Sequence, residues 1–258
     1  MIVHQQPGLC GLEVWHAVAR NVTLLQLREH KAEYFAGLRD FLEHLHAGDA
    51  STEAPEDTAR LSRAAGFERV VFCGGEARHP ALEQALDAAP LPFAFEIDRA
   101  GEFAARRGAL RLFEEYGWQR GVALDLGQTQ LKIFTASDCR VLPRNTDWLP
   151  LDHHALDADT GRTRLREFLR QGLATFPEQP DGVILALPVA LDRAGSAQPA
   201  TYPGLWGPLE PLFADLFPMA WVALNDAVLA ALGFRPVDGS KTLVLTLGFG
   251  IGGALWNA

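Results

Sequence analysis

The chain has no hydrophobic run that approaches the roughly 20 residues needed to span a bilayer. Its N-terminus lacks the basic segment followed by an apolar one that is typical of a secretory signal, so we expect a cytoplasmic protein. Cysteine is scarce: Cys10, Cys73 and Cys139 lie far apart and form no Cys-x-x-Cys pair. This spacing indicates reduced thiols rather than a zinc site or a disulfide framework.

Positive charge is also sparse, because 23 Lys and Arg residues stand against 32 Asp and Glu residues, for a formal net charge of −9. No block of basic residues stands out, so neither nucleic acid nor an anionic membrane is expected as a partner. Without a basic face or a helix-turn-helix segment, a repressor is not expected either. The chain of 258 residues is long enough for one large domain or two modest ones.

Strand-like and helix-like segments alternate along the sequence, which predicts an α/β fold. Continuous apolar runs bounded by glycine or proline indicate buried strands, and apolar residues at helical spacing indicate helices. The polar stretch 152–162 and the aperiodic stretch 193–207 are expected to be loops. The expected strands are 69–73, 93–97, 121–126, 130–135, 140–142, 183–187 and 221–224, and the expected helices are 17–46, 55–65, 80–88, 102–116, 163–174, 209–216 and 226–232.

The segment Leu124–Lys132 (LDLGQTQLK) is typical of two strands joined by a tight turn. Such a turn can direct backbone N–H groups and the Thr129 hydroxyl toward a phosphate. The carboxylate of Asp125, at the end of the first strand, could hold a hydrated Mg²⁺ beside that phosphate. An Asp-x-Gly turn is also a common hairpin, so this motif alone leaves both interpretations open.

A second glycine-rich segment, Gly248–Gly253, has four glycines in six positions after an apolar strand. Glycine lets the backbone approach a ligand closely or adopt positive φ. The alternative is a glycine-rich bend packed against a neighbouring element.

Asn225 and Asp226 lie at a strand-to-helix junction. Either residue could simply cap the helix. The functional interpretation makes Asp226 a general base at the mouth of a cleft, accepting a proton from a substrate hydroxyl.

Gly74 and Gly75 follow the strand expected at 69–73 and precede the helix expected at 80–88. Two glycines here could form a ledge on which a base or ribose lies against the backbone. The alternative is an ordinary strand-to-helix turn.

The two ends of the sequence carry related signals. Residues 241–258 (KTLVLTLGFGIGGALWNA) read as a strand, a glycine-rich turn and the start of a second strand. Residues 1–16 (MIVHQQPGLCGLEVWH) read as the returning strand of the same hairpin, followed by a loop with Glu13 and His16. This continuity predicts a circular permutant whose two ends build one active site, with Met1 and Ala258 close together.

Together, the four motifs resemble the two phosphate motifs, the catalytic aspartate and the adenosine motif of the actin-like ATPase superfamily. Within it, the chain is most similar to the ROK family of sugar kinases and repressors, which has Asp-x-Gly-Gly-Thr, Asn-Asp-Ala-x-x-Ala-Ala-x-Gly and Gly-Thr-Gly-Ile-Gly-Gly-Gly in that order. Joining Ala258 to Met1 restores the family order. In this chain the motifs occur as Gly74-Gly75, Asp125, Asp226 and Gly248–Gly253.

The resemblance implies two α/β domains of the ribonuclease H-like type, circularly permuted, with a nucleotide cleft between them. Residues 118–235 would form the small domain, with the first phosphate loop and the catalytic aspartate. Residues 1–117 and 236–258 would form a discontinuous large domain that binds nucleotide and sugar.

The resemblance also implies an ATP-dependent sugar kinase that uses Mg²⁺ and phosphorylates a hexose or a hexose-like sugar. Asp226 would be the general base and Asp125 the metal ligand. The implied sugar-binding residues are Asn225, Glu13, His16 and Thr201, and the implied nucleotide-binding residues are Asp125, Gly127, Gln128, Thr129, Gly248, Gly250, Gly252, Gly74 and Gly75.

The sequence departs from the family pattern in or near the substrate site. Three hypotheses therefore stay open: a sugar kinase, a non-catalytic sugar- or nucleotide-binding protein of the same fold, and an ATPase or phosphotransferase with a non-sugar acceptor. Whether the chain forms a homo-oligomer is also open. The departures are Gln128 and Val189 for glycine, Phe249 for a hydroxyl residue, Thr201 for asparagine and Phe234 for glutamate.

Overall fold

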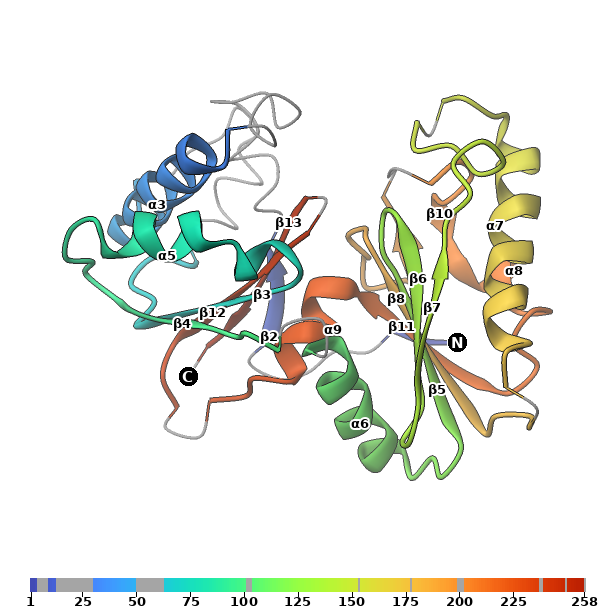
Figure 1. The fold of residues 1–258 in the computed structure, drawn as a ribbon. Coiled ribbons are helices and arrows are strands. Elements are labelled where there is room, and N and C mark those ends of the chain that lie inside the picture. The colour runs from blue at the N-terminus through green and yellow to red at the C-terminus, as the bar shows by residue number, and fades with distance from the viewer. Residues whose placement is uncertain are drawn as a thin grey trace. The chain divides into compact units, whose positions relative to one another are not determined.

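The computed structural model (Figure 1) shows two compact units with an α/β fold. Unit 1 contains residues 1–5 and 105–233, and unit 2 contains residues 6–104 and 234–258. This division assigns 105–117 and the first five residues to unit 1, whereas the sequence predicted them in the large domain. The structure describes residues 1–3, 9–12, 30–49, 63–100, 104–152, 154–176, 178–198, 202–236, 239–248 and 250–257.

The main sheet of unit 1 has six described strands in the order β1-β11-β8-β5-β6-β7. The pairs β5–β8, β8–β11 and β11–β1 are parallel, whereas β5–β6 and β6–β7 are antiparallel. Strands β5 and β8 are buried along their whole length, which explains their continuous apolar sequences. The strands are β1 (Ile2–Val3), β5 (Gly121–Leu126), β6 (Gln130–Phe134), β7 (Cys139–Pro143), β8 (Gly182–Leu187) and β11 (Ala220–Asn225).

Helices cover both faces of this sheet (Figure 1). On one face, α7 (Ala158–Leu173) and α8 (Leu209–Phe213) pack on the core that includes Leu124, Leu185 and Phe213. On the other face lie α6 (Ala104–Tyr116) and α9 (Asp226–Leu232). These two helices approach so closely at Gly108 that a Cβ there would overlap the carbonyl of Leu229.

The sequence placed the start of α7 too late, at residue 163. Asp157 caps the helix instead: its carboxylate accepts from the N–H groups of Asp159 (3.1 Å) and Thr160 (2.9 Å). The polar character of 152–162 therefore includes a capping signal and the exposed first turn of a helix. Residues 193–207, expected to be a loop, contain a small antiparallel pair, β9 (Ser196–Ala197) and β10 (Gly207–Pro208).

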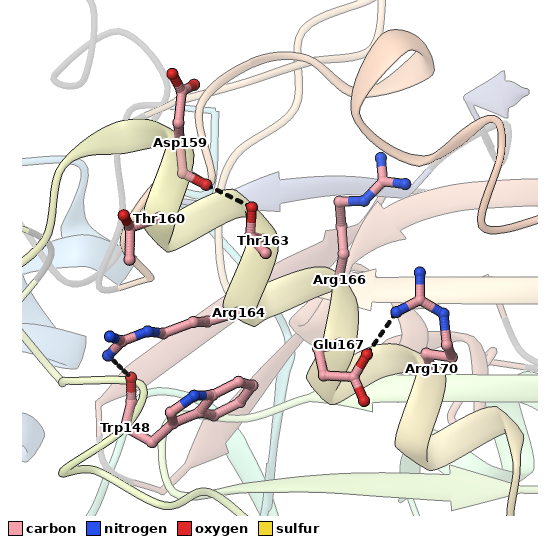
Figure 2. Close-up of a pocket in the computed structure, with 8 residues that line it drawn as sticks. All are labelled: Trp148, Asp159, Thr160, Thr163, Arg164, Arg166, Glu167 and Arg170. Carbon is pink, nitrogen blue, oxygen red and sulfur yellow. Dashed lines mark hydrogen bonds and ion pairs between the residues drawn. The ribbon is translucent and has the colours of Figure 1, made fainter.

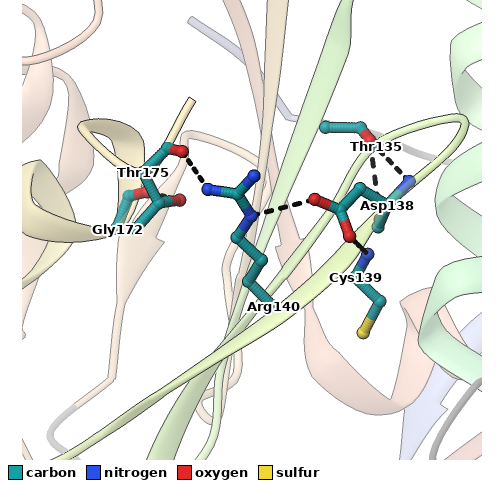
Figure 3. A network of polar contacts seen from close by, with 6 residues as sticks. All are labelled: Thr135, Asp138, Cys139, Arg140, Gly172 and Thr175. Carbon is teal, nitrogen blue, oxygen red and sulfur yellow. Dashed lines mark hydrogen bonds and ion pairs between the residues drawn. The ribbon is translucent and has the colours of Figure 1, made fainter. Parts of the chain in front are cut away.

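The turn between β6 and β7 is tied to the end of α7 (Figure 3). Asp138 donates its N–H to Thr135 Oγ1 (2.9 Å), and its carboxylate accepts from Arg140 Nε (2.9 Å). Arg140 also donates to the carbonyl of Thr175 and lies 4.7 Å from the Phe176 ring. The hydrogen bond from Arg140 holds the pKa of Asp138 below its usual value. This network fixes the outer edge of the sheet to a helix.

The described strands of unit 2 form a five-stranded sheet in the order β2-β13-β12-β3-β4. Helices α3 (Lys31–Ala47) and α5 (Pro80–Asp87) pack on it through apolar residues such as Phe35, Leu38 and Leu82. A short 3₁₀ helix, η1 (Glu76–Arg78), connects β3 to α5. The strands are β2 (Leu9–Leu12), β3 (Arg69–Cys73), β4 (Ala94–Ile97), β12 (Thr242–Leu247) and β13 (Ile251–Trp256).

The two sheets share one pattern of pairing. In unit 1 an antiparallel ribbon, β5-β6-β7, continues through β5 into the parallel strands β8 and β11. In unit 2 the ribbon is β12-β13-β2, and it continues through β12 into the parallel strands β3 and β4. The unit 1 strands follow one another in sequence, whereas the equivalent series in unit 2 begins at β12 and passes from β13 to β2.

The predicted returning strand near the N-terminus is only partly right. Leu9–Leu12 pairs antiparallel with β13, with Leu9 opposite Trp256 and Leu12 opposite Gly253. Ile2–Val3 pairs instead with β11, so this dipeptide extends the sheet of unit 1. Ala258 lies outside the described residues, and the expected proximity of Met1 and Ala258 stays a prediction.

Candidate active site

Asp125 and Lys132 are opposite each other in the β5–β6 hairpin. Asp125 is buried, and Lys132 Nζ lies 3.2 Å from its Oδ2 atom. Both side chains extend from the face of the sheet opposite the α7 and α8 core, because alternate residues of β5 such as Leu124 belong to that core. Sequence reasoning named Asp125 but missed Lys132. The hairpin register would have revealed it, since Leu126 pairs with Leu131 and the next pair is Asp125 with Lys132.

Asp226 follows β11 and begins α9. Because β5, β8 and β11 are parallel, their carboxyl ends meet at one edge of the sheet, which places Asp125 and Asp226 at that edge. Burial, and then the negative charge of Asp125, raise the pKa of Asp226 to about 7, against the opposing effects of the Ala227 N–H and Lys132. A carboxylate with this pKa is suited to act as a general base near neutral pH.

Asn225 uses its side-chain amide within the fold. Its Oδ1 accepts from the N–H groups of Ala227 (2.9 Å) and Val228 (3.3 Å), which makes it the N-cap of α9. Its Nδ2 donates to the carbonyls of Val189 (3.1 Å) and Leu187 (3.4 Å). Asn225 therefore fixes the start of α9, and with it the position of Asp226, against the end of β8.

The turn Gly127–Thr129 joins β5 to β6. The Gly127 N–H donates to the carbonyls of Asp125 (3.1 Å) and Gln130 (3.0 Å), and Thr129 is exposed. No residue of the turn has a positive φ, so Gln128 takes its place without backbone strain. Two residues that sequence reasoning missed, Arg144 and Tyr202, donate hydrogen bonds to carbonyls of this turn.

Asp125 and Gln128, at the end of β5 and in the turn that follows, offer oxygen atoms of the kind that bind a hydrated Mg²⁺. The Oε1 atom of Gln128 is buried and has no hydrogen-bond partner within the described residues. A carboxylate and an amide oxygen are ligands that Mg²⁺ prefers, and this ion keeps several waters or phosphate oxygens as well. No group of three or more His, Cys, Asp or Glu residues in the described part of the chain could hold a metal by itself. Asp125 and Gln128 therefore suit an ion that also binds phosphate oxygens.

In unit 2, the two glycine motifs lie against each other at the ends of β3 and β12. Cys73 is opposite Thr246, and a Cβ on Gly74 would overlap the carbonyl of Leu247. Gly74 also has a φ of 97°, a region that favours glycine. Gly75, by contrast, has ordinary helical φ and open space around its Cβ position.

The glycine-rich loop after β12 is shorter than expected. Gly248 donates its N–H to the carbonyl of Gly250 (3.0 Å), and β13 begins at Ile251. Gly252 is therefore a strand residue opposite Thr246, rather than part of a loop. Four residues of interest, Glu13, His16, Thr201 and Phe249, lie outside the described residues.

A shallow pocket lies on the outer surface of α7 (Figure 2), on the sheet face opposite Asp125. Its arginines already have partners: Arg164 donates to the carbonyl of Trp148, Arg166 to Asp215, and Arg170 to Glu167. Because carboxylates compensate the charges of Arg166 and Arg170 and a carbonyl occupies Arg164, this pocket is a poor candidate for the nucleotide site.

No protein-family model and no curated protein matches the chain. Among solved structures, a glucokinase from Parabacteroides distasonis matches with 25% sequence identity over 41% of this chain and a TM-score of 0.30. The matched part spans 30% of the glucokinase chain. A TM-score this low does not establish a common fold. Within the residues that the structure describes, no helix has the length and apolarity required to cross a membrane.

Proposed function

We propose that this chain is an ATP-dependent kinase that phosphorylates a hydroxyl group of a hexose-like sugar, on a circularly permuted actin-like ATPase fold. The observation that carries the proposal is the meeting of Asp226 with the Asp125–Lys132 pair at one sheet edge, where the pKa of Asp226 is about 7. A base with this pKa, next to a phosphate-type turn and a cation, is what phosphoryl transfer to an alcohol requires.

The topology supports the fold assigned by this proposal. Two units with the same strand pattern, an antiparallel ribbon followed by two parallel strands, are expected for the two domains of an actin-like ATPase. The pairing of β2 with β13 supports the permutation, because it completes in unit 2 the ribbon that β5, β6 and β7 form in unit 1.

In the proposed reaction, the substrate hydroxyl attacks the γ-phosphorus of ATP. The new bond joins that oxygen to phosphorus, the bond to the β-phosphate oxygen breaks, and the hydroxyl proton passes to the carboxylate of Asp226. Lys132 would reduce the repulsion between Asp125 and the phosphates. Mg²⁺, held by Asp125 and Gln128, would neutralise negative charge on the phosphates.

For the remaining site residues, the proposal assigns the roles that the sequence predicted. The turn Gly127–Thr129 and glycines 248, 250 and 252 would contact phosphates, and glycines 74 and 75 the adenosine. Glu13, His16 and Thr201 would bind sugar hydroxyls.

The test is an assay of ADP release with MgATP and a panel of hexoses, hexosamines and polyols. We expect at least one sugar to accelerate ADP release, and Asp226→Asn to reduce the rate by a factor of about 100 or more. Asp215→Asn is the matched control, because Asp215 is exposed and paired with Arg166 on the opposite side of the sheet. Full activity in Asp226→Asn would contradict the assigned base.

Calorimetry with ATP and the same sugars separates the alternatives. Binding without turnover would indicate a non-catalytic binding protein. ATP turnover that no sugar accelerates would indicate a different acceptor.

A further inference from the structure

The carbonyl oxygens of three successive residues in the Gly127–Thr129 turn all accept hydrogen bonds from two distant residues. Tyr202 Oη donates to the Gly127 carbonyl (2.5 Å), Arg144 Nη1 to the Gln128 carbonyl (3.0 Å), and the Arg144 backbone N–H to the Thr129 carbonyl (2.9 Å). Each of the three carbonyl groups of the turn is thus fixed by a hydrogen bond from Arg144 or Tyr202.

Arg144 and Tyr202 also hold each other. The Arg144 guanidinium carbon lies 3.7 Å from the centre of the Tyr202 ring, within the range of a cation–π interaction. Arg144 donates further bonds to the carbonyls of Leu149 (2.8 Å) and Pro150. Arg144 is only 6% exposed and Tyr202 is fully buried. If either side chain rotated away from the Gly127–Thr129 turn, buried polar groups would lose their hydrogen bonds.

The protonation states of the pair are fixed across the working pH range. Burial raises the pKa of Tyr202 to about 12, so its hydroxyl remains a donor. Burial lowers the pKa of Arg144, yet a guanidinium stays charged in proteins.

Holding the carbonyls determines where the amides point. In a trans peptide, the C=O and the following N–H point in opposite directions. The carbonyls of Gly127 and Gln128 face Tyr202 and Arg144, so the N–H groups of Gln128 and Thr129 face away from them. Neither N–H has a protein acceptor in the described part of the chain, which leaves two adjacent donors available to an anion.

We propose that Arg144 and Tyr202 are positioning residues that hold the amides of Gln128 and Thr129 in the orientation that binds the phosphates of a nucleoside triphosphate. This inference rests on the proposed function for the identity of the anion. It also explains how a turn with Gln128 in place of a second glycine keeps one conformation: the restraint comes from donors outside the turn.

The test compares wild type with Tyr202→Phe, which removes one hydrogen bond but keeps the ring beneath Arg144. Calorimetry measures the Kd of ATP, inorganic tripolyphosphate and adenosine for each protein. We expect Kd for ATP and for tripolyphosphate to rise about 5- to 10-fold, the loss of roughly one hydrogen bond, with no change for adenosine. Tyr116→Phe, a hydroxyl deletion elsewhere in unit 1, should change none of the three.

A second variant, Arg144→Lys, keeps the charge but cannot make the fork of hydrogen bonds. It should weaken ATP binding more than Tyr202→Phe does. Hydrogen exchange supplies a readout that does not depend on ligand: the Gly127 and Arg144 amides, which donate to the carbonyls of Gln130 and Thr129, should exchange faster in both variants than in wild type, while amides in β8 exchange at the wild-type rate.

Four outcomes are distinguishable. Equal ATP affinity in wild type and Tyr202→Phe overturns the positioning role and leaves the proposed kinase intact. An equal loss for adenosine and ATP also overturns it, because that pattern indicates general damage. If the variant binds ATP more weakly but wild type phosphorylates no sugar, the positioning role is supported and the proposed kinase activity is contradicted. No binding of ATP or tripolyphosphate by wild type overturns both.

Discussion

Lys132 forms an ion pair with Asp125 across the β5–β6 hairpin, with 3.2 Å between Nζ and Oδ2. The Asp125 side chain is 7% exposed and that of Lys132 is 26% exposed, so the carboxylate has little access to solvent. A buried carboxylate depends on such a partner because water cannot replace it. This ion pair also lies near Asp226, whose pKa responds to both charges.

The first prediction concerns this ion pair. Lys132→Met should lower the free energy of unfolding of unit 1 by about 2 to 4 kcal/mol, because it leaves the Asp125 carboxylate without its counter-charge. The double variant Asp125→Asn/Lys132→Met should recover most of that loss, since neither charge remains. Urea denaturation, followed by a probe in unit 1, measures both. A double variant as unstable as the single one would show that Lys132 acts through packing instead.

The second prediction concerns Asp226 and pH. Its pKa is raised from 3.8 to about 7, so the folded protein binds this proton more tightly than the unfolded chain does. Stability is therefore lost as pH rises from about 4 to about 7, and Asp226→Asn should be more stable than wild type above pH 7. The difference between the two proteins should grow by up to about 3 kcal/mol between pH 5 and pH 8.

Thermal unfolding without Mg²⁺ or nucleotide measures this effect. Asp215→Asn is the control: its hydrogen bond to Arg166 lowers the pKa of Asp215, so this variant should gain no stability at high pH. A constant difference between wild type and Asp226→Asn at every pH would contradict the raised pKa.

The third prediction separates two adjacent glycines. Gly74→Ala should destabilise unit 2 by about 2 to 4 kcal/mol, because it combines a positive φ with overlap against Leu247. Gly75→Ala should leave unfolding nearly unchanged, since nothing lies within 4 Å of its Cβ position. If Gly75 contacts adenosine as proposed, the same methyl group should weaken adenosine binding. Unchanged adenosine binding by a folded Gly75→Ala protein would remove Gly75 from the nucleotide site.

The fourth prediction concerns the packing of α6 on α9. Gly108→Ala should destabilise unit 1 by about 3 kcal/mol, because a methyl group cannot fit against the carbonyl of Leu229. Gly37→Ala is the matched change, in the middle of α3 and with nothing within 4 Å of its Cβ position. It should stabilise α3 by about 0.5 to 1 kcal/mol. Melting curves of the two variants should shift in opposite directions.

Much of the fold follows from local sequence. The strands at 69–73 and 121–126 and the helix at 226–232 occur with the predicted bounds, because continuous apolar runs and a capping residue specify them locally. The start of α7 was wrong because its first turn is polar and exposed. Residues 2–3 were predicted within the returning strand of the C-terminal hairpin, and their partner was wrong because β1 pairs with β11, which is remote in sequence.

In the candidate site too, residues within local motifs could be predicted, whereas residues that act through distant contacts could not. Asp125 and Asp226 could be named because each lies at a strand end within a recognisable motif. Tyr202 lies 75 residues from Gly127, and no spacing rule connects a buried tyrosine to a particular carbonyl. Asn225 was predicted to bind substrate, yet its side-chain oxygen and nitrogen both form hydrogen bonds that fix the start of α9.

The pairing of β2 with β13 has a consequence for synthesis on the ribosome. Strand β2 is made before α3, but its neighbour in the sheet leaves the ribosome only after all of unit 1 has been translated. Strands β5 to β11 can pair while the rest of the chain is still being made, whereas the sheet of unit 2 must wait for β12 and β13. For most of its translation, a nascent chain would therefore carry α3, β3 and α5 without the strands β12 and β13 that complete their core.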